Sequence, residues 1–375
     1  MAFPHVITES CNIGLKSTSW AAGLLLTGAV VLAQTPVFTE YPRPLNSQPL
    51  GITSGSDGNL WFTESLRNKI GRITTAGVYS EFAVPTVNSF PYFIAAGPDG
   101  NLWFTEELSN KIGRITTTGT ITEFSIPTPS TFPHWITAGA DGNLWFTEDA
   151  MHKIGRIATG GVITEFPVPG DTEANGITSG PDGNVWFTST VAGVIGRITP
   201  GGVFSTFPLP ALIGANGITA GPDGNLWFLD QGASKIGRMT TGGVFTIFPI
   251  PSPDQGGPNC MVNCGIGDQP IQITPGPDGN LWFTEQLGQF GLGRITTSGV
   301  ITEFHVPTPN SIPFGITLGS DGNMWFTEVA GKIGRAALPA LPPGVPVPSS
   351  LLLVCTGLLA LMSWSGWRAL RHHSP

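Results

Sequence analysis

The sequence predicts an all-β fold: a seven-bladed β-propeller of four-stranded blades, closed by the N-terminal strand. Three observations predict it. The dipeptide Trp-Phe recurs seven times, the segments between its copies have the composition of short strands, and one strand of the repeat stands at the beginning of the chain instead of its end. Repeats of about 40 residues with four short strands each are typical of propeller blades.

The composition supports this fold class. Of the 375 residues only 11% are charged, and 51 Gly and 34 Pro argue against long helices. An aromatic share of 10% supplies enough apolar surface for a large core. The net charge of −8 and the total of 17 Lys and Arg exclude the basic face that nucleic-acid binding requires. Separately, we expect the chain to be a monomer.

The first element is an apolar, uncharged stretch at residues 20–33, which follows Lys16 and ends in Val31-Leu32-Ala33. Such a segment is typical of a secretory signal peptide, so we assign residues 1–33 to one and expect cleavage after Ala33. An uncleaved anchor is the alternative. In both cases we expect the rest of the chain to be exported to the periplasm, the outer envelope or the cell surface.

Residues 34–338 form the predicted propeller. Trp-Phe begins at 61, 103, 145, 186, 227, 282 and 325, and each copy continues as Thr-Glu, Lys-Ile-Gly-Arg-Ile-Thr and Gly-Val-Ile-Thr-Glu-Phe, with variations. An Asp-Gly-Asn step before each Trp-Phe tolerates the positive φ of a tight hairpin between the first two strands. Each repeat therefore contributes four strands.

Ring closure follows from the fourth strand. Its first copy, at Glu40-Tyr41, precedes every Trp-Phe, and the last Trp-Phe unit has no fourth strand after it. Residues Val37 to Tyr41 can complete the last blade and remove the open sheet edge. An open solenoid is the alternative, but it would not need this displacement.

The last elements are a Pro-rich linker at 339–350 and a tail at 351–375. The tail's 17 uncharged residues, 351–367, reach about 26 Å as a helix and run into Arg368 and Arg371, which predicts a membrane span. With Pro346, Pro348 and Ser349 before it, the tail resembles a PEP-CTERM sorting signal, which implies a sorting protease as partner. Val347 stands where that family has Glu, and a plain anchor explains the same residues.

The repeated motifs Trp-Phe-Thr-Glu, Lys-Ile-Gly-Arg-Ile-Thr and Pro-x-Gly-Ile-Thr resemble virginiamycin B lyases (streptogramin lyases) over residues 37–337. The resemblance implies elimination that opens the ring ester of a streptogramin B, with Mg²⁺, a His base, a further His and two Glu. The matching positions here hold Phe314 for the base, Ile271 for the further His, and Ile312 and Val329 for the glutamates. A carbon–oxygen lyase is therefore one hypothesis, and a non-catalytic ligand- or protein-binding propeller anchored at the cell envelope is the alternative.

Candidate site residues are those that break the sevenfold pattern around the channel. We define the first rim position as three residues before the recurrent Thr of the innermost strand, and the second as four residues after Trp. The first holds Leu50, Tyr92, His134, Asn175, Asn216, Ile271 and Phe314, and the second holds Ser65, Glu107, Asp149, Thr190, Gln231, Gln286 and Val329.

Polar members cluster in blades two to five, and apolar ones in blades seven and one. A His beside a carboxylate can act as a general base, so His134 and Asp149 are the catalytic candidates. Simple polarity of the rim is the alternative. We expect ligand binding by five further polar members: Tyr92, Glu107, Asn175, Asn216 and Gln231.

Two further expectations concern scaffold residues. The recurrent Gly-Arg arginines should pair with blade acids such as Glu64, Glu106 and Glu148. Within the long insertion between blades five and six, Cys260 and Cys264 are candidates for a local disulfide in an oxidising compartment.

Overall fold

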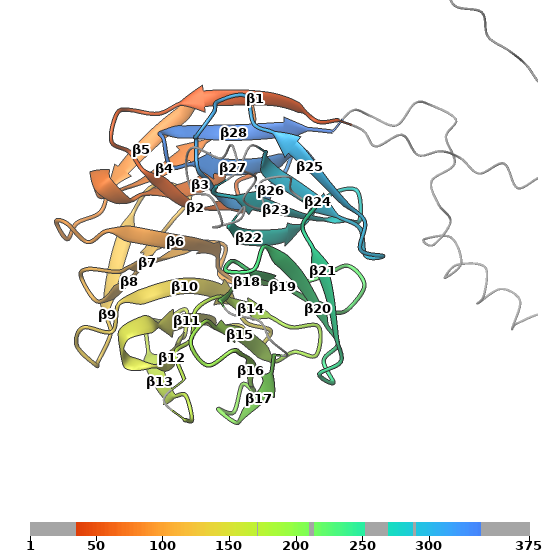
Figure 1. Ribbon diagram of the computed structural model, residues 1–375. Coiled ribbons are helices and arrows are strands. Elements are labelled where there is room, and N and C mark those ends of the chain that lie inside the picture. Colours follow the sequence, from red (N-terminus) through yellow and green to blue (C-terminus); the bar gives the residue numbers. More distant parts are fainter. Residues whose placement is uncertain (1–34, 171, 210–213, 252–268, 288–289, 339–375) are drawn as a thin grey trace, which may run out of the picture. The chain divides into compact units, whose positions relative to one another are not determined.

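The computed structural model describes residues 35–170, 172–209, 214–251, 269–287 and 290–338. Within them, seven antiparallel four-stranded sheets are arranged as the blades of a propeller (Figure 1). The innermost strands contact one another in ring order, and the innermost strand of blade 7 contacts that of blade 1. The predicted seven-bladed all-β propeller is confirmed.

The blades are given from the innermost strand outward. Blade 1 has β2 (Pro49–Ser54), β3 (Leu60–Glu64), β4 (Lys69–Ile73) and β5 (Tyr79–Ala83); blade 2 has β6 (Pro91–Ala96), β7 (Leu102–Glu106), β8 (Lys111–Ile115) and β9 (Ile121–Ser125). Blade 3 has β10 (Pro133–Ala138), β11 (Leu144–Glu148), β12 (Lys153–Ile157) and β13 (Ile163–Pro167); blade 4 has β14 (Ile177–Ser179), β15 (Val185–Ser189), β16 (Val194–Ile198) and β17 (Phe204–Pro208). Blade 5 has β18 (Ala215–Ala220), β19 (Leu226–Asp230), β20 (Lys235–Met239) and β21 (Phe245–Pro249); blade 6 has β22 (Pro270–Pro275), β23 (Leu281–Glu285), β24 (Gly291–Ile295) and β25 (Ile301–His305). Blade 7 has β26 (Pro313–Leu318), β27 (Met324–Glu328), β28 (Lys332–Ala337) and β1 (Val37–Pro42). Two 3-10 turns, η1 (Ser65–Arg67) and η2 (Asp149–Met151), follow β3 and β11.

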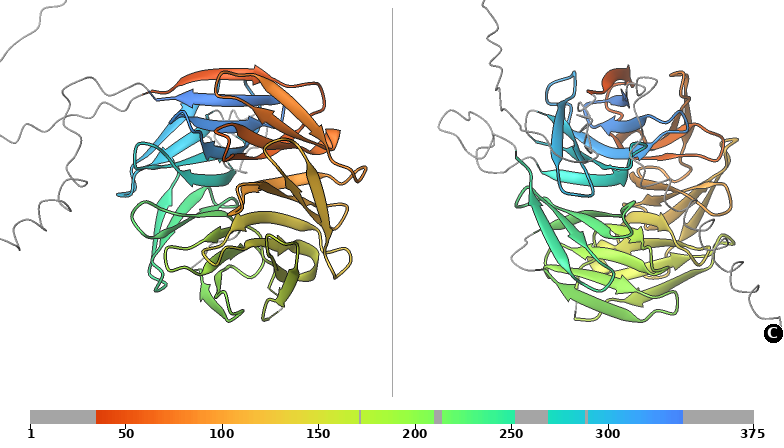
Figure 2. Two further views of the ribbon diagram at one scale, coloured as in Figure 1. Left: turned by 180° about the vertical axis from the view of Figure 1, so that it is seen from behind. Right: turned by 90° about the vertical axis from the view of Figure 1, so that its right-hand side faces the viewer.

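The N-terminal strand closes the ring as predicted. β1 pairs antiparallel with β28, from Val37 opposite Ala337 to Pro42 opposite Lys332, and the two strands lie side by side in Figures 1 and 2. The Tyr41 ring stacks on Trp325 at 5.5 Å, as Phe82 stacks on Trp61 at 5.4 Å in blade 1. The displaced strand therefore makes the same contact as an ordinary outer strand.

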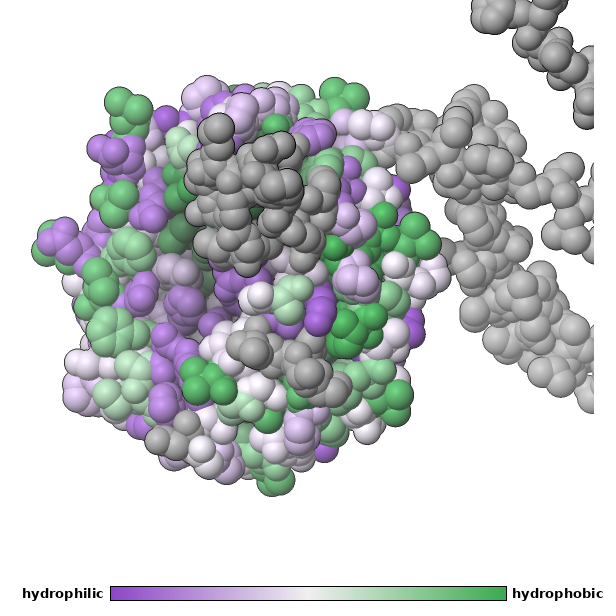
Figure 3. All heavy atoms as spheres, viewed as in Figure 1, coloured by the Kyte–Doolittle hydropathy of each residue, from purple (hydrophilic) through white to green (hydrophobic). Residues whose placement is uncertain are grey.

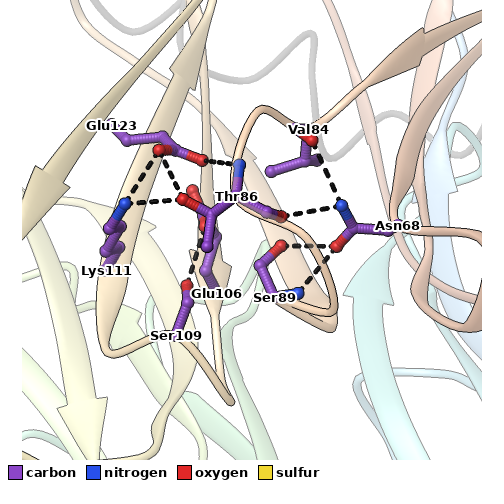
Figure 4. A network of polar contacts seen from close by, with 8 residues as sticks. All are labelled: Asn68, Val84, Thr86, Ser89, Glu106, Ser109, Lys111 and Glu123. Carbon is purple, nitrogen blue, oxygen red and sulfur yellow. Dashed lines mark hydrogen bonds and ion pairs between the residues drawn. The ribbon is translucent and has the colours of Figure 1, made fainter.

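Polar contacts at the closure also repeat those of an ordinary blade. In blade 2, Glu123 accepts hydrogen bonds from the Thr86 backbone N–H at 2.8 Å and from Lys111 Nζ at 2.9 Å (Figure 4). In blade 7, Glu40 accepts the corresponding bonds from the Thr308 backbone N–H at 3.0 Å and Lys332 Nζ at 2.5 Å. Strand β1 thus belongs to the blade through its side chains as well as its backbone.

The core is built from the repeated aromatic residues. All seven tryptophans of the Trp-Phe pairs are fully buried, and each indole Nε1 donates to the Asp of its own Asp-Gly-Asn turn at 2.9–3.1 Å. In that turn Gly58 has a φ of 75°, which favours glycine. Exposed hydrophobic residues on the face drawn in Figure 3 form small separate groups.

The expectation for the Gly-Arg arginines is wrong. Five of the seven lie 2.9–4.0 Å from the Asp of their own turn, and Arg335 Nε donates to Asp321 Oδ2 at 2.9 Å. The other two, Arg114 and Arg156, donate to the backbone carbonyls of Thr159 and Pro200. The reason is register, since Arg72 lies opposite Trp61, whose indole binds the turn Asp, whereas Glu64 lies opposite Lys69 at the other end of the strand. The glutamates proposed as partners, Glu64, Glu106 and Glu148, are fully buried.

Several predicted segments lie outside the described residues: the signal peptide, the linker, the membrane-spanning tail, and the cysteines Cys260 and Cys264. Within the part of the chain that is described, no helix has the length and apolar character needed to span a bilayer.

Candidate functional site

The first rim position divides the channel into two sides. Leu50, Ile271 and Phe314, from blades 1, 6 and 7, are 3%, 3% and 8% exposed and belong to one apolar cluster, which also contains Phe93 and Trp135. The polar members of blades 3, 4 and 5, at the same strand position, are partly exposed: His134, Asn175 and Asn216. The rim therefore has an apolar side and a polar side.

The apolar side includes the positions at which the resemblance implies catalytic residues. Ile271 and Phe314 are buried in the cluster, and Val329 packs against it. The fourth position is Ile312, whose backbone has a φ of 56°. None of these four side chains can accept a proton or bind a cation.

His134 stands on β10 at the polar side. Its ring stacks on the Tyr92 ring of β6, with centroids 4.1 Å apart and planes 27° from parallel. Burial lowers the pKa of His134 to about 4, although the charge of Asp149 and the Asn175 side chain raise it. The imidazole is therefore neutral at pH 7, and its buried Nδ1 has no hydrogen-bond partner among the described residues.

Two carboxyl groups share a hydrogen bond beside this histidine. Asp149 begins η2, directly after β11, and Glu173 lies in the link that leads to β14. Burial, the hydrogen bond to Asp149 and the charge of Asp149 together raise the pKa of Glu173 to about 7. Glu173 therefore keeps its proton up to about neutral pH, because burial and the adjacent Asp149 both disfavour its charged form.

Sequence reasoning missed Glu173. It precedes the first rim position of blade 4 by two residues, as Ile312 does in blade 7 and Phe132 in blade 3. A comparison of this third position through all seven blades would have found it, since the series Gln48, Phe90, Phe132, Glu173, Gly214, Gln269 and Ile312 contains one ionisable residue.

Tyr92 and Glu107 join the same cluster from blade 2. Burial raises the pKa of the Tyr92 hydroxyl, and the charges of Glu107 and Asp149 raise it further. Burial and the charge of Asp149 likewise raise the pKa of Glu107. The structure therefore brings Tyr92, Glu107, His134, Asp149 and Asn175 together with Glu173, and we call these six residues the rim cluster.

Blade 5 contributes a separate pair. Asn216 Nδ2 donates to Gln231 Oε1 at 3.2 Å. Several buried polar atoms on this side of the rim have no hydrogen-bond partner within the described residues: His134 Nδ1, Trp135 Nε1, Asp149 Oδ1, Asn175 Oδ1 and Asn216 Oδ1. Because buried polar atoms are normally paired, this concentration favours a site that a polar ligand or water completes.

The described residues do not fit the Mg²⁺ that the resemblance implies. Among them, no group of three or more His, Cys, Asp or Glu side chains is arranged to hold a metal ion. The side chains at the positions where the resemblance implies His and Glu offer no ligand atoms: Phe314, Ile271, Ile312 and Val329.

A seven-bladed propeller with a polar cluster on one side of its channel defines a class of proteins that present ligand-binding residues on a rigid ring. Within that class, the chain belongs to the virginiamycin B lyase family, whose model matches residues 3–262 and 264–340.

Solved structures agree with this assignment. Virginiamycin B lyase from Staphylococcus aureus is 36% identical, with 81% of this chain and 99% of that one covered and a TM-score of 0.74. A streptogramin B lyase is 37% identical, with 81% and 98% covered and a TM-score of 0.75. A catalytically inactive variant of the S. aureus lyase with quinupristin is 36% identical, with 81% and 100% covered and a TM-score of 0.73.

Proposed function

We propose that this chain binds a streptogramin B-type ligand at the rim cluster of blades 2 to 4, on the side of the channel opposite in character to blades 6, 7 and 1. The observation that carries the proposal is His134, stacked on Tyr92, with a buried Nδ1 that has no partner among the described residues. The family relationship supplies the ligand class, since one relative has been solved with quinupristin.

The chemistry of the cluster suits recognition. A neutral imidazole offers one ring nitrogen as a donor or an acceptor without the cost of burying a charge. Asn175 Oδ1 and Asn216 Oδ1 offer acceptors for ligand N–H groups. The partly exposed Tyr92 ring, packed on the core, adds aromatic surface for apolar parts of a ligand.

A second candidate function is elimination at the same cluster, favoured by the Asp149–Glu173 pair. A carboxyl with a pKa of about 7 has a suitable strength for proton transfer at neutral pH. In this reaction the unprotonated base takes a proton from the carbon next to the ester-bearing carbon. A carbon–carbon double bond forms, and the carbon–oxygen bond breaks so that the ring carboxylate leaves with its electron pair.

Experiments with quinupristin test the two candidate functions, ligand binding and elimination, separately. Calorimetry with the purified full-length chain should show saturable binding that His134→Ala weakens at least tenfold, whereas the control His305→Ala on the outer strand β25 leaves it unchanged. Absence of binding, or equal binding by His134→Ala, would refute the proposed site. Mass spectrometry after incubation with and without Mg²⁺ tests elimination, because the ring-opened product has the same mass as quinupristin but a different retention time and fragmentation.

Export and anchoring also belong to this proposal. The apolar stretch at 20–33 and the tail at 351–375 support a protein that is exported and held, at least transiently, at the cell envelope. Cell fractionation with and without each segment tests it: deletion of 1–33 should retain the chain in the cytoplasm, and deletion of 351–375 should release it from the membrane fraction. Unchanged fractionation would contradict it.

A further inference from the structure

The junction between blades 7 and 1, where the ring closes, contains a cavity of about 330 Å³. We call it the seam cavity. The link from Arg43 to Gln48 lines it, together with Leu66 and the turn Val329, Ala330 and Gly331. No member of the rim cluster lines it, so it is distinct from the proposed ligand site.

In two of the other junctions an Asn side chain occupies the corresponding space, whereas the equivalent positions of blades 3 to 6 hold His152, Gly193, Ser234 and Phe290. Between blades 1 and 2, Asn68 Nδ2 donates to the carbonyl oxygens of Val84 at 3.1 Å and Thr86 at 2.8 Å (Figure 4). Its Oδ1 accepts from the backbone N–H of Ser89 at 2.8 Å and from Ser89 Oγ at 2.7 Å. One carboxamide therefore satisfies four polar groups.

The junction between blades 2 and 3 repeats this arrangement. Asn110 donates to the Ile126 and Thr128 carbonyls at 3.2 and 2.9 Å, and its Oδ1 accepts from Thr131 N and Oγ1 at 2.8 Å each. A carboxamide between the turn of one blade and the link to the next is thus a regular part of both junctions.

The seam lacks that carboxamide because Gly331 stands in place of Asn before the third strand, in a turn one residue shorter. Ser47, the counterpart of Ser89, is fully buried, and its Oγ has no hydrogen-bond partner among the described residues. A Cβ added to Gly331 would lie 3.6 Å from Ser47 Oγ. The hydroxyl therefore faces the space into which the absent side chain would extend.

The junction between blades 7 and 1 also contains a cation that the other two junctions lack. Arg43 occupies the place of Val84 and Ile126 in the other links. Its Nε donates to the Tyr41 carbonyl at 3.3 Å and its guanidinium lies 3.9 Å from the centre of the Tyr79 ring, while Nη1 is buried without a hydrogen-bond partner in the described part of the chain.

We propose that the seam cavity binds a small carboxylate with a compact apolar body. A carboxylate accepts hydrogen bonds from both unpaired donors, Arg43 Nη1 and Ser47 Oγ, and takes the place of the missing carboxamide. Pro44, Leu66, Val329 and Ala330 provide apolar walls for the body of the ligand. Arg43 selects a carboxylate over a neutral amide, because the guanidinium–carboxylate pair adds charge to the hydrogen bond.

Occupancy should also strengthen ring closure. The link that begins at Arg43 continues directly from β1, and the backbone N–H of Arg43 donates to the Gly331 carbonyl at 2.8 Å. A ligand that bonds to this link and packs on the turn of blade 7 binds the closed ring better than the opened one. Its binding therefore raises the melting temperature with concentration.

Benzoate is the probe, and benzamide, which has the same shape without the charge, is its matched control. With the full-length chain, calorimetry should give saturable benzoate binding and a melting temperature that rises with benzoate, and benzamide should bind at least tenfold more weakly. Arg43→Met should weaken benzoate binding at least tenfold and Ser47→Ala several-fold. The control Arg67→Met, which removes a nearby cation, should leave it unchanged.

Three results would overturn the proposal: no saturable benzoate binding, equal binding of benzamide, or unchanged benzoate binding by Ser47→Ala. The last variant removes one oxygen atom, so it keeps the test decisive if Arg43→Met does not fold. Quinupristin binding by Ser47→Ala should equal that of the unmodified chain, which separates failure here from failure of the rim-cluster proposal.

Discussion

The two sides of the channel rim share one backbone and differ in chemistry. On blades 6, 7 and 1 the first rim position holds Ile271, Phe314 and Leu50, which are packed in one core, whereas blades 3 to 5 present His134, Asn175 and Asn216. The strand pairing that positions them is the same in each blade, apart from the shorter innermost strand of blade 4. The repeat therefore fixes where a side chain stands, and the residue type alone decides whether the position is structural or chemical.

We expect the largest effect on stability from a substitution on the apolar side of the rim. Phe314→Ala should lower the free energy of unfolding by about 3–4 kcal/mol, because it empties a buried site in contact with the rings of Tyr92 and Phe93. The matched change on the polar side, Asn216→Ala, should cost less than about 1 kcal/mol. Urea unfolding of both variants measures this difference, and similar losses would mean that the two sides are not different in kind.

A second comparison concerns the buried glutamates that end the second strands. Burial raises the pKa of Glu148, in blade 3, to about 8 and that of Glu328, in blade 7, to about 7. A raised pKa means that the folded state holds a proton that the unfolded state releases above its own pKa of about 4.5. Stability from these groups is therefore complete below pH 4.5 and is lost as pH rises toward 8.

The unmodified chain should accordingly be more stable at pH 5 than at pH 8. Glu148→Gln should recover on the order of 2 kcal/mol at pH 8, since the amide needs no proton to remain neutral. Glu328→Gln should recover less, because its pKa is raised less. Thermal unfolding at both pH values measures the effect, and a Glu148→Gln variant as pH-dependent as the unmodified chain would contradict it.

The sequence predicted the scaffold better than the rim, for physical reasons. Seven copies of the same strand signals and one displaced copy at Glu40-Tyr41 determine the blade number and its closure without knowledge of any contact. The partner of each arginine could not be deduced in this way, because register decides between the turn Asp and the Glu at the far strand end. Glu173 lay outside both chosen positions, and its proximity to Asp149 depends on the path of the link before β14.

A third, smaller effect concerns the pH dependence of ligand binding on the polar side of the rim. As the pH rises through about 7, Glu173 loses its proton, so the rim gains a negative charge beside Asp149 and the hydrogen bond between the two side chains is lost. Quinupristin affinity should therefore fall by about tenfold between pH 5.5 and pH 8.5, a difference of about 1.4 kcal/mol. Glu173→Gln keeps a donor at every pH and should flatten this dependence in calorimetry, and a variant that retains the full pH dependence would rule out the pair as its source.

The smallest effect belongs to blade 5, at the margin of the polar side. Asn216 Nδ2 donates to Gln231 Oε1 at 3.2 Å, a neutral bond between two partly exposed side chains. Gln231→Ala should leave the melting temperature nearly unchanged. It should weaken quinupristin binding two- to fivefold, since a hydrogen bond of this kind contributes about 0.5–1 kcal/mol. If the loss instead equals that of His134→Ala, blade 5 belongs to the centre of the site; if affinity does not change, the site ends at Asn175. Either result places the boundary between the side of the rim that binds and the side that packs.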